Sequence, residues 1–159
     1  MHIDLEGTFL FSNLTPEQQA LIVGGSEYLN FDRGDLFIKD EDTANSLYII
    51  VDGVAQVIKS GARGVTKLKD IGAGVVIGEM SYGISGANRT ATCMAGIGGV
   101  RVLCVPYSTI TGLKKTSPEL YMIILERLLK IAHGYLRDSN EYLHSLKPAV
   151  QFAKRYGAI

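Results

Sequence analysis

The sequence predicts an α+β fold: an antiparallel, jelly-roll-like β-roll with an N-terminal helix, a short helix within one loop and a C-terminal helical arm. Short β-rich runs separated by turn formers occupy residues 27–105, and helix signals flank them on both sides. Glycine is also unusually frequent, at 18 of 159 residues, as expected for many turns. We expect residues 1–159 to form one domain, with an N-terminal helical segment at 1–26 and C-terminal helices at 106–159.

The first predicted helix begins after Thr15 and runs to Val23. Thr15 is a suitable N-cap, and Pro16 occupies the first helical position, where its missing N–H is harmless. The pair Gly24-Gly25 then stops the helix.

The β-rich region is predicted from runs of β-branched and aromatic residues between turn formers. We expect strands at 28–31 and 36–38, a hairpin that turns at Asp52-Gly53, a second hairpin that turns at 60–64, and strands at 91–95 and 100–105 around a glycine turn at 96–99.

A long helix is predicted to begin at Ser117-Pro118-Glu119 and to end near Leu146. Lys147-Pro148 is then a hinge before a last amphipathic segment at 149–156. The helix carries an apolar stripe that either packs on the roll or serves a homodimer; it consists of Leu120, Ile124, Leu128 and Ile131.

Charge and composition exclude several classes of function. Sixteen basic and sixteen acidic residues do not give the basic surface of a protein that binds a nucleic-acid polymer or an anionic membrane. The acidic N-terminus and the absence of an apolar run of about 18 residues predict a cytoplasmic protein. We expect Cys93 and Cys104 to be reduced core thiols.

Metal and catalytic chemistry are not indicated either. His2, His133 and His144 have no partners at metal-ligand spacing, and no catalytic triad or carboxylate pair is evident. We therefore expect no metal, no cofactor and no enzymatic activity.

Residues 77–92 carry the residues suited to an anionic, hydroxyl-bearing ligand. Glycines allow backbone amides to approach a phosphate, Arg89 supplies a fork-shaped cation, and Thr90 adds a hydroxyl. Glu79 would repel an anion, so its expected partner is a sugar hydroxyl. The segment therefore predicts a site for one phosphate and one ribose.

This segment resembles the phosphate-binding cassette of the cyclic nucleotide-binding domain family. Gly78-Glu79, nine residues and then Arg89-Thr90-Ala91 carry the resemblance, which extends over about residues 9–146. It implies that Arg89 pairs with the cyclic phosphate and that Glu79 accepts a hydrogen bond from the ribose 2′-hydroxyl. It further implies a ligand set of Gly78, Glu79, Met80, Ser81, Arg89, Thr90 and Ala91, with amides near Met80 and Ser81 assisting.

The cassette departs from the common family pattern in two places. Met80-Ser81 replaces Leu-Ala, and Asn88 replaces a proline that would stiffen the loop. The spacing between Glu79 and Arg89 is of the bacterial type.

The resemblance implies a sensor that binds cAMP in preference to cGMP and signals to a partner protein, or within a parent protein, through movement of its C-terminal helices. Aromatic residues that could cap the base are Tyr135, Tyr142, Phe152 and Tyr156. The thirteen residues after Leu146 are too few for a helix-turn-helix module. The alternative is an interaction or scaffold module of the same fold that no longer binds nucleotide.

Overall fold

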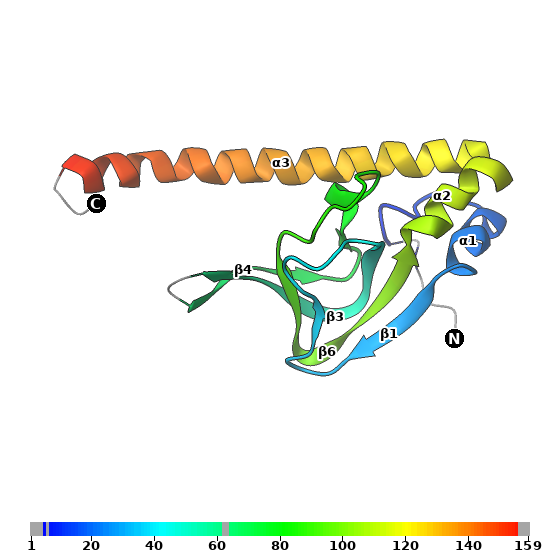
Figure 1. The fold of residues 1–159 in the computed structure, drawn as a ribbon, viewed down its shortest axis with the longest axis horizontal. Coiled ribbons are helices and arrows are strands. Elements are labelled where there is room, and N and C mark those ends of the chain that lie inside the picture. Colours follow the sequence, from blue (N-terminus) through cyan, green and yellow to red (C-terminus); the bar gives the residue numbers. More distant parts are fainter. Residues whose placement is uncertain (1–4, 6, 62–63, 156–159) are drawn as a thin grey trace.

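The computed structural model describes residue 5 and residues 7–61 and 64–155, with the backbone alone at 149, 150, 152 and 153 (Figure 1). Its elements follow one another as helix α1, five strands, a short 3₁₀ helix η1, a sixth strand and two helices. Their bounds are α1 Pro16–Val23, β1 Glu27–Phe31, β2 Leu36–Ile38, β3 Ser46–Gly61, β4 Gly64–Gly72, β5 Val76–Ile77, η1 Glu79–Ser81, β6 Thr92–Pro106, α2 Tyr107–Thr116 and α3 Pro118–Arg155.

The six strands form one antiparallel sheet around two long central strands, β3 and β6. The sheet order is β1-β6-β3-β4, with β2 also paired to β6 and β5 also paired to β3. Helices α1 and α2 lie at one end of this roll, and α3 runs across it and beyond it (Figure 1). The α+β fold predicted from the sequence, a β-roll with flanking helices, is confirmed.

The expected turns at Asp52-Gly53 and at residues 96–99 are wrong, because β3 and β6 each continue through them. The pairing register shifts between Ile50 and Asp52 and again between Gly53 and Ala55, so both strands bend here without reversing. Gly53 has a φ of 84° and Gly99 one of 79°. A side chain on Gly53 would collide with the carbonyl oxygen of Gly99, which only a glycine avoids.

The second expected hairpin is present. Strands β3 and β4 pair as far as Gly61 opposite Gly64. The residues between them lie outside the described ranges.

Helix α1 has the predicted bounds and the predicted cap. The Thr15 hydroxyl accepts a hydrogen bond from the Gln18 amide at 3.3 Å, and the Gln18 side chain accepts one from the Thr15 amide at 3.0 Å. This reciprocal pair is a capping box, which satisfies two N–H groups at the helix start.

The C-terminal region differs from the prediction in one respect. Helix α3 is continuous from Pro118 to Arg155, so it neither ends near Leu146 nor hinges at Lys147-Pro148, and Pro148 lies inside it. A proline in a helix gives up one backbone hydrogen bond, and here that loss does not end the helix. Helix α2, which the sequence reading placed within the helical arm without bounds, precedes it.

The hydrophobic core has two parts that share strands β3 and β6. One part lies between the roll and the helices, and the other fills the interior of the roll. Leu120, Ile124 and Leu128 of the predicted stripe are buried in the first part, and Ile131 packs against it. The stripe therefore packs on the roll. Cys93 is buried, Cys104 is partly buried, and both are free thiols.

Candidate functional site

The loop between β5 and β6 carries the predicted cassette. Strand β5 pairs with β3, with Ile77 opposite Tyr48, and Gly78 then turns the chain with a φ of 97°. A side chain at Gly78 would collide with the Arg89 guanidinium and would meet the Ser46 carbonyl oxygen at 2.8 Å. Glycine at this position therefore lets the backbone pass directly beside the arginine.

Helix η1 follows Gly78, where the sequence predicted a short helix. The amide of Ser81 donates to the Gly78 carbonyl at 3.4 Å, and the amide of Tyr82 donates to the Glu79 carbonyl at 3.2 Å. The Tyr107 hydroxyl of α2 donates to the Gly78 carbonyl at 2.6 Å. The start of the cassette is thus tied to the C-terminal helices.

All seven predicted ligand residues line one cavity of about 140 Å³. Strands β2, β3, β4 and β5, the cassette, the start of β6 and helix α3 each contribute to its wall. The lining residues are Ile38, Val57, Lys69, Ile71, Val75, Val76, Ile77, Gly78, Glu79, Met80, Ser81, Arg89, Thr90, Ala91, Cys93 and Tyr135.

Arg89 is buried in this wall, and one of its guanidinium nitrogens lacks a hydrogen-bond partner among the described residues. Its residue exposure is 8%, and its Nη2 donates to the Ser46 carbonyl at 2.7 Å. Its Nη1 is buried and has no hydrogen-bond partner among the described residues. Since buried charged groups are usually paired, this N–H group is suited to an anion entering the cavity.

Glu79 is the other buried ionisable group of the cassette. Burial raises the pKa of its carboxyl, an effect that backbone hydrogen bonds and the positive charges of Lys69 and Arg89 oppose. No ion pair within 4 Å joins Glu79 to Arg89 in the part of the chain that the structure describes. The carboxylate is therefore available to accept a hydrogen bond from a hydroxyl group of a ligand.

Of the predicted aromatic caps whose side chains the structure describes, Tyr135 lines the cavity. Its hydroxyl donates to the Val76 carbonyl at 2.9 Å, and the Lys69 ammonium lies 4.5 Å from its ring centroid. Burial raises the pKa of Tyr135 to about 12. Tyr142 is exposed and outside the cavity, the Phe152 side chain lies outside the described residues, and so does Tyr156.

Sequence reasoning missed Lys69 and the apolar wall formed by Ile38, Val57 and Ile71. These residues come from three separate strands and carry no local motif. Their only signal is the alternation of inward-facing residues along a strand, which does not by itself indicate a ligand cavity.

Among the described residues, no three His, Cys, Asp or Glu side chains are grouped so that they could hold a metal ion. No helix in the described ranges is both long and apolar enough to cross a membrane.

Solved structures with the same fold come from several bacteria. A cyclic nucleotide-binding domain from Methylobacillus flagellatus KT is 23% identical with a TM-score of 0.78, and the alignment covers 89% of this chain and 83% of that one. The Thermus thermophilus catabolite activator protein is 21% identical with a TM-score of 0.73, covering 88% of this chain and 63% of that one. This chain thus spans less than two thirds of that protein.

A cyclic nucleotide-binding-like protein from Brucella abortus is 27% identical with a TM-score of 0.60, covering 70% of this chain and 94% of that one. No curated protein gives a significant match. A sequence model of the cyclic nucleotide-binding domain matches residues 28–117, from β1 to the end of α2, and it describes a binding domain and no catalytic family. The chain therefore belongs to the cyclic nucleotide-binding domain family.

Proposed function

We propose that this chain is a regulatory module that binds cAMP in preference to cGMP, and that it is not an enzyme. The observation that carries the proposal is the buried Arg89 in the cavity wall, whose Nη1 has no hydrogen-bond partner among the described residues. The cyclic phosphate accepts a hydrogen bond from this Arg89 group, and the Glu79 carboxylate accepts one from the ribose 2′-hydroxyl. The cavity wall is otherwise largely apolar, which offers few partners to the 2-amino and 6-oxo groups that distinguish guanine from adenine.

Titration calorimetry of the purified chain with cAMP and with cGMP tests this function. We expect saturable binding of both, tighter for cAMP, and a loss of at least about 100-fold in affinity for Arg89→Ala, because a charged hydrogen bond to phosphate is removed. The exposed Arg33→Ala is the matched control and should bind as the wild type does. No saturable heat with either nucleotide would support the scaffold alternative, and equal binding by Arg89→Ala would remove Arg89 from the site.

We propose that ligand binding is transmitted by α3. The cavity of about 140 Å³ is smaller than the roughly 300 Å³ at the lower end of small-molecule sites. Tyr135 of α3 forms part of its wall and is attached to β5 and β4 through Val76 and Lys69. A nucleotide that enters the cavity displaces this ring, and α3 moves with it.

Hydrogen exchange of the α3 backbone with and without cAMP tests the transmission step. We expect the amides of residues 131–139 to change protection on binding in the wild type but not in Arg89→Ala. Saturating nucleotide that leaves their exchange unchanged would contradict the involvement of α3.

The outer face of α3 supports a homodimer as the route by which this movement is passed on. Exposed apolar side chains recur at every seventh residue, with Met122 63%, Leu129 72%, Leu136 56% and Leu143 60% exposed. Leu125, Ala132 and Leu146 lie three residues after members of this series, which together is the a/d pattern of a two-stranded coiled coil. This face, the heptad face, is distinct from the buried stripe.

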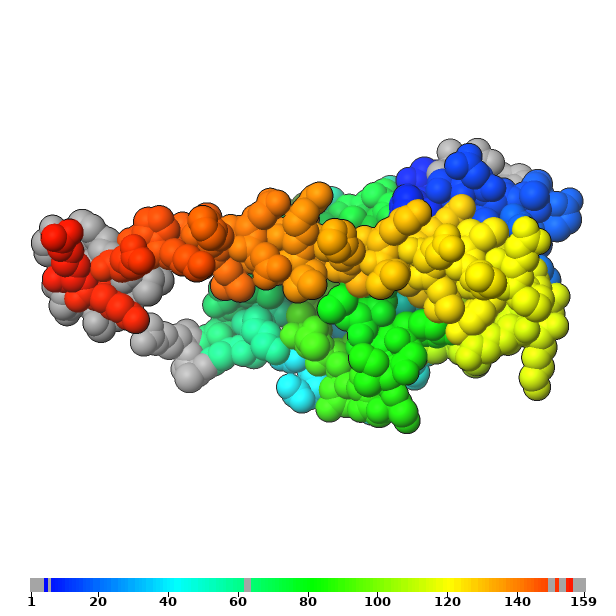
Figure 2. Space-filling view, turned by 90° about the horizontal axis from the view of Figure 1, so that it is seen from above, coloured from blue at the N-terminus to red at the C-terminus, as the bar shows by residue number. Residues whose placement is uncertain are grey.

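The second half of α3 needs such a partner on physical grounds. Every described side chain from Leu136 to Pro148 is exposed, and Figures 1 and 2 show this half extending past the roll. Helices in proteins derive most of their stability from packing an apolar face, which this half lacks within one chain. A second copy of α3 would bury the heptad face.

Sedimentation equilibrium tests the dimer. We expect a mass twice the 17.2 kDa of the chain for the wild type, and a monomer for Leu129→Glu/Leu136→Glu, since two charges enter the apolar seam. Lys130→Glu, an exposed position outside the seam, is the control and should remain dimeric. A monomeric wild type at all concentrations measured would reject the dimer while leaving nucleotide binding untouched.

A further inference from the structure

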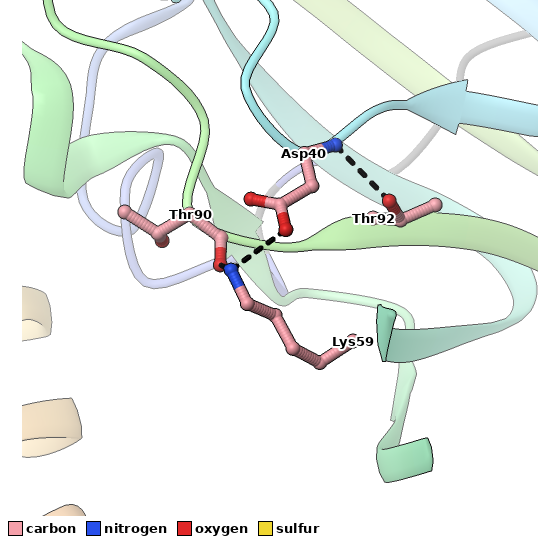
Figure 3. A network of polar contacts seen from close by, with 4 residues as sticks. All are labelled: Asp40, Lys59, Thr90 and Thr92. Carbon is pink, nitrogen blue, oxygen red and sulfur yellow. Dashed lines mark hydrogen bonds and ion pairs between the residues drawn. The ribbon is translucent and has the colours of Figure 1, made fainter. Parts of the chain in front are cut away.

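Lys59 connects two segments that are far apart in the sequence and lie at the rim of the cassette. It lies in β3, and its ammonium forms an ion pair with the Asp40 carboxylate at 2.7 Å and donates to the Thr90 carbonyl at 2.9 Å. Figure 3 shows the lysine reaching both groups at once, with the Asp40 amide bonded to the Thr92 hydroxyl. Neither Lys59 nor Asp40 lines the nucleotide cavity, whereas Thr90 does.

The second half of the cassette is held by the loop between β2 and β3. The Arg89 amide donates to the Asp42 carbonyl at 2.7 Å, and the Glu41 amide donates to the Arg89 carbonyl at 3.0 Å. Glu41 adopts a φ of 69°, a left-handed conformation that is uncommon for a glutamate. Both backbone polar groups of Arg89 are thus fixed by this loop.

The backbone hydrogen bonds between the cassette and the loop between β2 and β3 end at Arg89, and the next carbonyl, that of Thr90, accepts a hydrogen bond from the Lys59 side chain. The next amide of the loop, that of Asp40, donates to the Thr92 hydroxyl at 3.0 Å. Lys59 supplies a charged donor to the Thr90 carbonyl instead, and charged donors form the stronger hydrogen bonds.

Asp40 holds the lysine in place. Its Oδ2 faces the ammonium at 2.7 Å, while its Oδ1 is buried without a hydrogen-bond partner among the described residues. Lys59 is therefore the group that balances the Asp40 charge. Since the lysine side chain is 44% exposed and that of the aspartate 18%, the ion pair alone adds little stability, and its effect is to orient the lysine.

We propose that Lys59 and Asp40 are positioning residues for the phosphate site: Asp40 orients Lys59, and Lys59 fixes the Thr90 carbonyl, so that Arg89 and Thr90 present their side chains to the cyclic phosphate. The inference rests on the proposed function, because it assigns these two residues a role in the affinity of that same site. They act through Arg89 and Thr90 and do not touch the ligand.

Calorimetry with cAMP on Lys59→Met and Lys59→Arg tests the role. We expect Lys59→Met, which keeps the length of the side chain without its donor, to weaken binding by about 5- to 20-fold. Lys59→Arg keeps a charged donor and should bind within about threefold of the wild type. Lys67→Met is the matched control, because Lys67 of β4 also forms an ion pair with an aspartate, at 2.6 Å from Asp70, but does not line the cavity.

Changing Lys59 in an Arg89→Lys background distinguishes a positioning role from a general loss of structure. In Arg89→Lys protein, where the fork-shaped contact is already lost, Lys59→Met should weaken cAMP binding by less than about twofold. A full additional loss in that background, or wild-type affinity in Lys59→Met itself, would overturn the proposal.

Hydrogen exchange at the Arg89 amide gives a readout that needs no nucleotide. We expect faster exchange in Lys59→Met than in the wild type and in Lys67→Met, because the Arg89–Thr90 backbone is released. Unchanged exchange would overturn the role of Lys59 even if the wild type binds cAMP. If exchange is faster in Lys59→Met but the wild type binds no nucleotide, the proposed function and the phosphate role are overturned, while Lys59 is still shown to hold this backbone.

Discussion

Glu79 and Arg89 are buried to the same degree, each with 8% of its surface exposed, but the fold compensates them differently. Arg89 has one firm partner, the Ser46 carbonyl at 2.7 Å. Glu79 has no ion-pair partner within 4 Å among the described residues. Backbone hydrogen bonds and the charges of Lys69 and Arg89 favour its ionised form, but burial outweighs them and raises the pKa of the carboxyl. A carboxylate in this setting is less stable than in water, and a hydroxyl donor from a ligand would relieve it.

The raised pKa of Glu79 gives a pH-dependent prediction. Below the ordinary glutamate pKa the carboxyl is neutral whether folded or unfolded, and as pH rises through its raised folded-state pKa the folded protein loses stability. Glu79→Gln should therefore have a higher thermal midpoint than the wild type at pH 7 to 8, and the difference should vanish as pH falls below about 4. Thermal unfolding measured by circular dichroism across this range provides the check.

The same variant separates stability from function. Because an amide is a poorer acceptor than a carboxylate, cAMP affinity should fall in Glu79→Gln although its stability rises. A variant that is both more stable and equally tight in binding would show that Glu79 does not accept the ribose hydroxyl.

At the scale of elements, the sequence predicted what local chemistry determines. Thr15 caps α1 as expected, and Gly78 turns the chain into the expected short helix. The Asp52-Gly53 signal failed because a left-handed glycine serves a bend in a paired strand as well as it serves a turn. The choice depends on Gly99, which lies far away in the sequence but precedes Val100, the residue paired with Gly53, and whose carbonyl oxygen faces Gly53.

The cassette residues were predictable for the same local reason, since they occur in one loop. Lys69 was not predictable, and Tyr135 was only one of four candidate caps, because these two residues reach the cavity from β4 and α3 and their meeting depends on the tertiary fold. Helix α3 continues past its expected end. Pro148 removes one backbone hydrogen bond, and the helix is formed on both sides of it.

Tyr135 provides a prediction at the scale of α3. In Tyr135→Phe the ring remains over the cavity beside Lys69, but the hydrogen bond to the Val76 carbonyl is lost. Loss of one partly buried hydrogen bond should reduce the free energy of unfolding by about 1 kcal/mol. Chemical denaturation with urea measures this change; Tyr142→Phe, on the exposed part of the same helix, is the control and should have no effect.

At the scale of the whole molecule, β3 and β6 place residues in both parts of the core. Ile49 and Leu103 belong to the part beneath the helices, while the adjacent Ile50 and Val102 belong to the interior of the roll. Successive residues of a strand face opposite sides, so each central strand links the two parts. We expect the roll and the first half of α3 to unfold together.

Ile124→Ala tests this linkage from the helix side. Ile124 of α3 is 1% exposed in the core part between the helices and the roll, and its truncation should reduce the free energy of unfolding by about 2–5 kcal/mol. Far-ultraviolet dichroism, which follows the whole fold, and tyrosine fluorescence should still report a single coincident transition. Two separate transitions would show that the helices detach before the roll unfolds.

The length of α3 beyond Tyr135 has a mechanical consequence. Twenty residues separate Tyr135 from Arg155 along the helix, which at 1.5 Å per residue is about 30 Å. A tilt of about 10° at the tyrosine therefore displaces the far end by about 5 Å, one helical turn. The projecting helix acts as a lever, so a small displacement of the Tyr135 ring by a nucleobase becomes a larger shift at the far end. A neighbouring helix packed against that end would then contact residues one turn away.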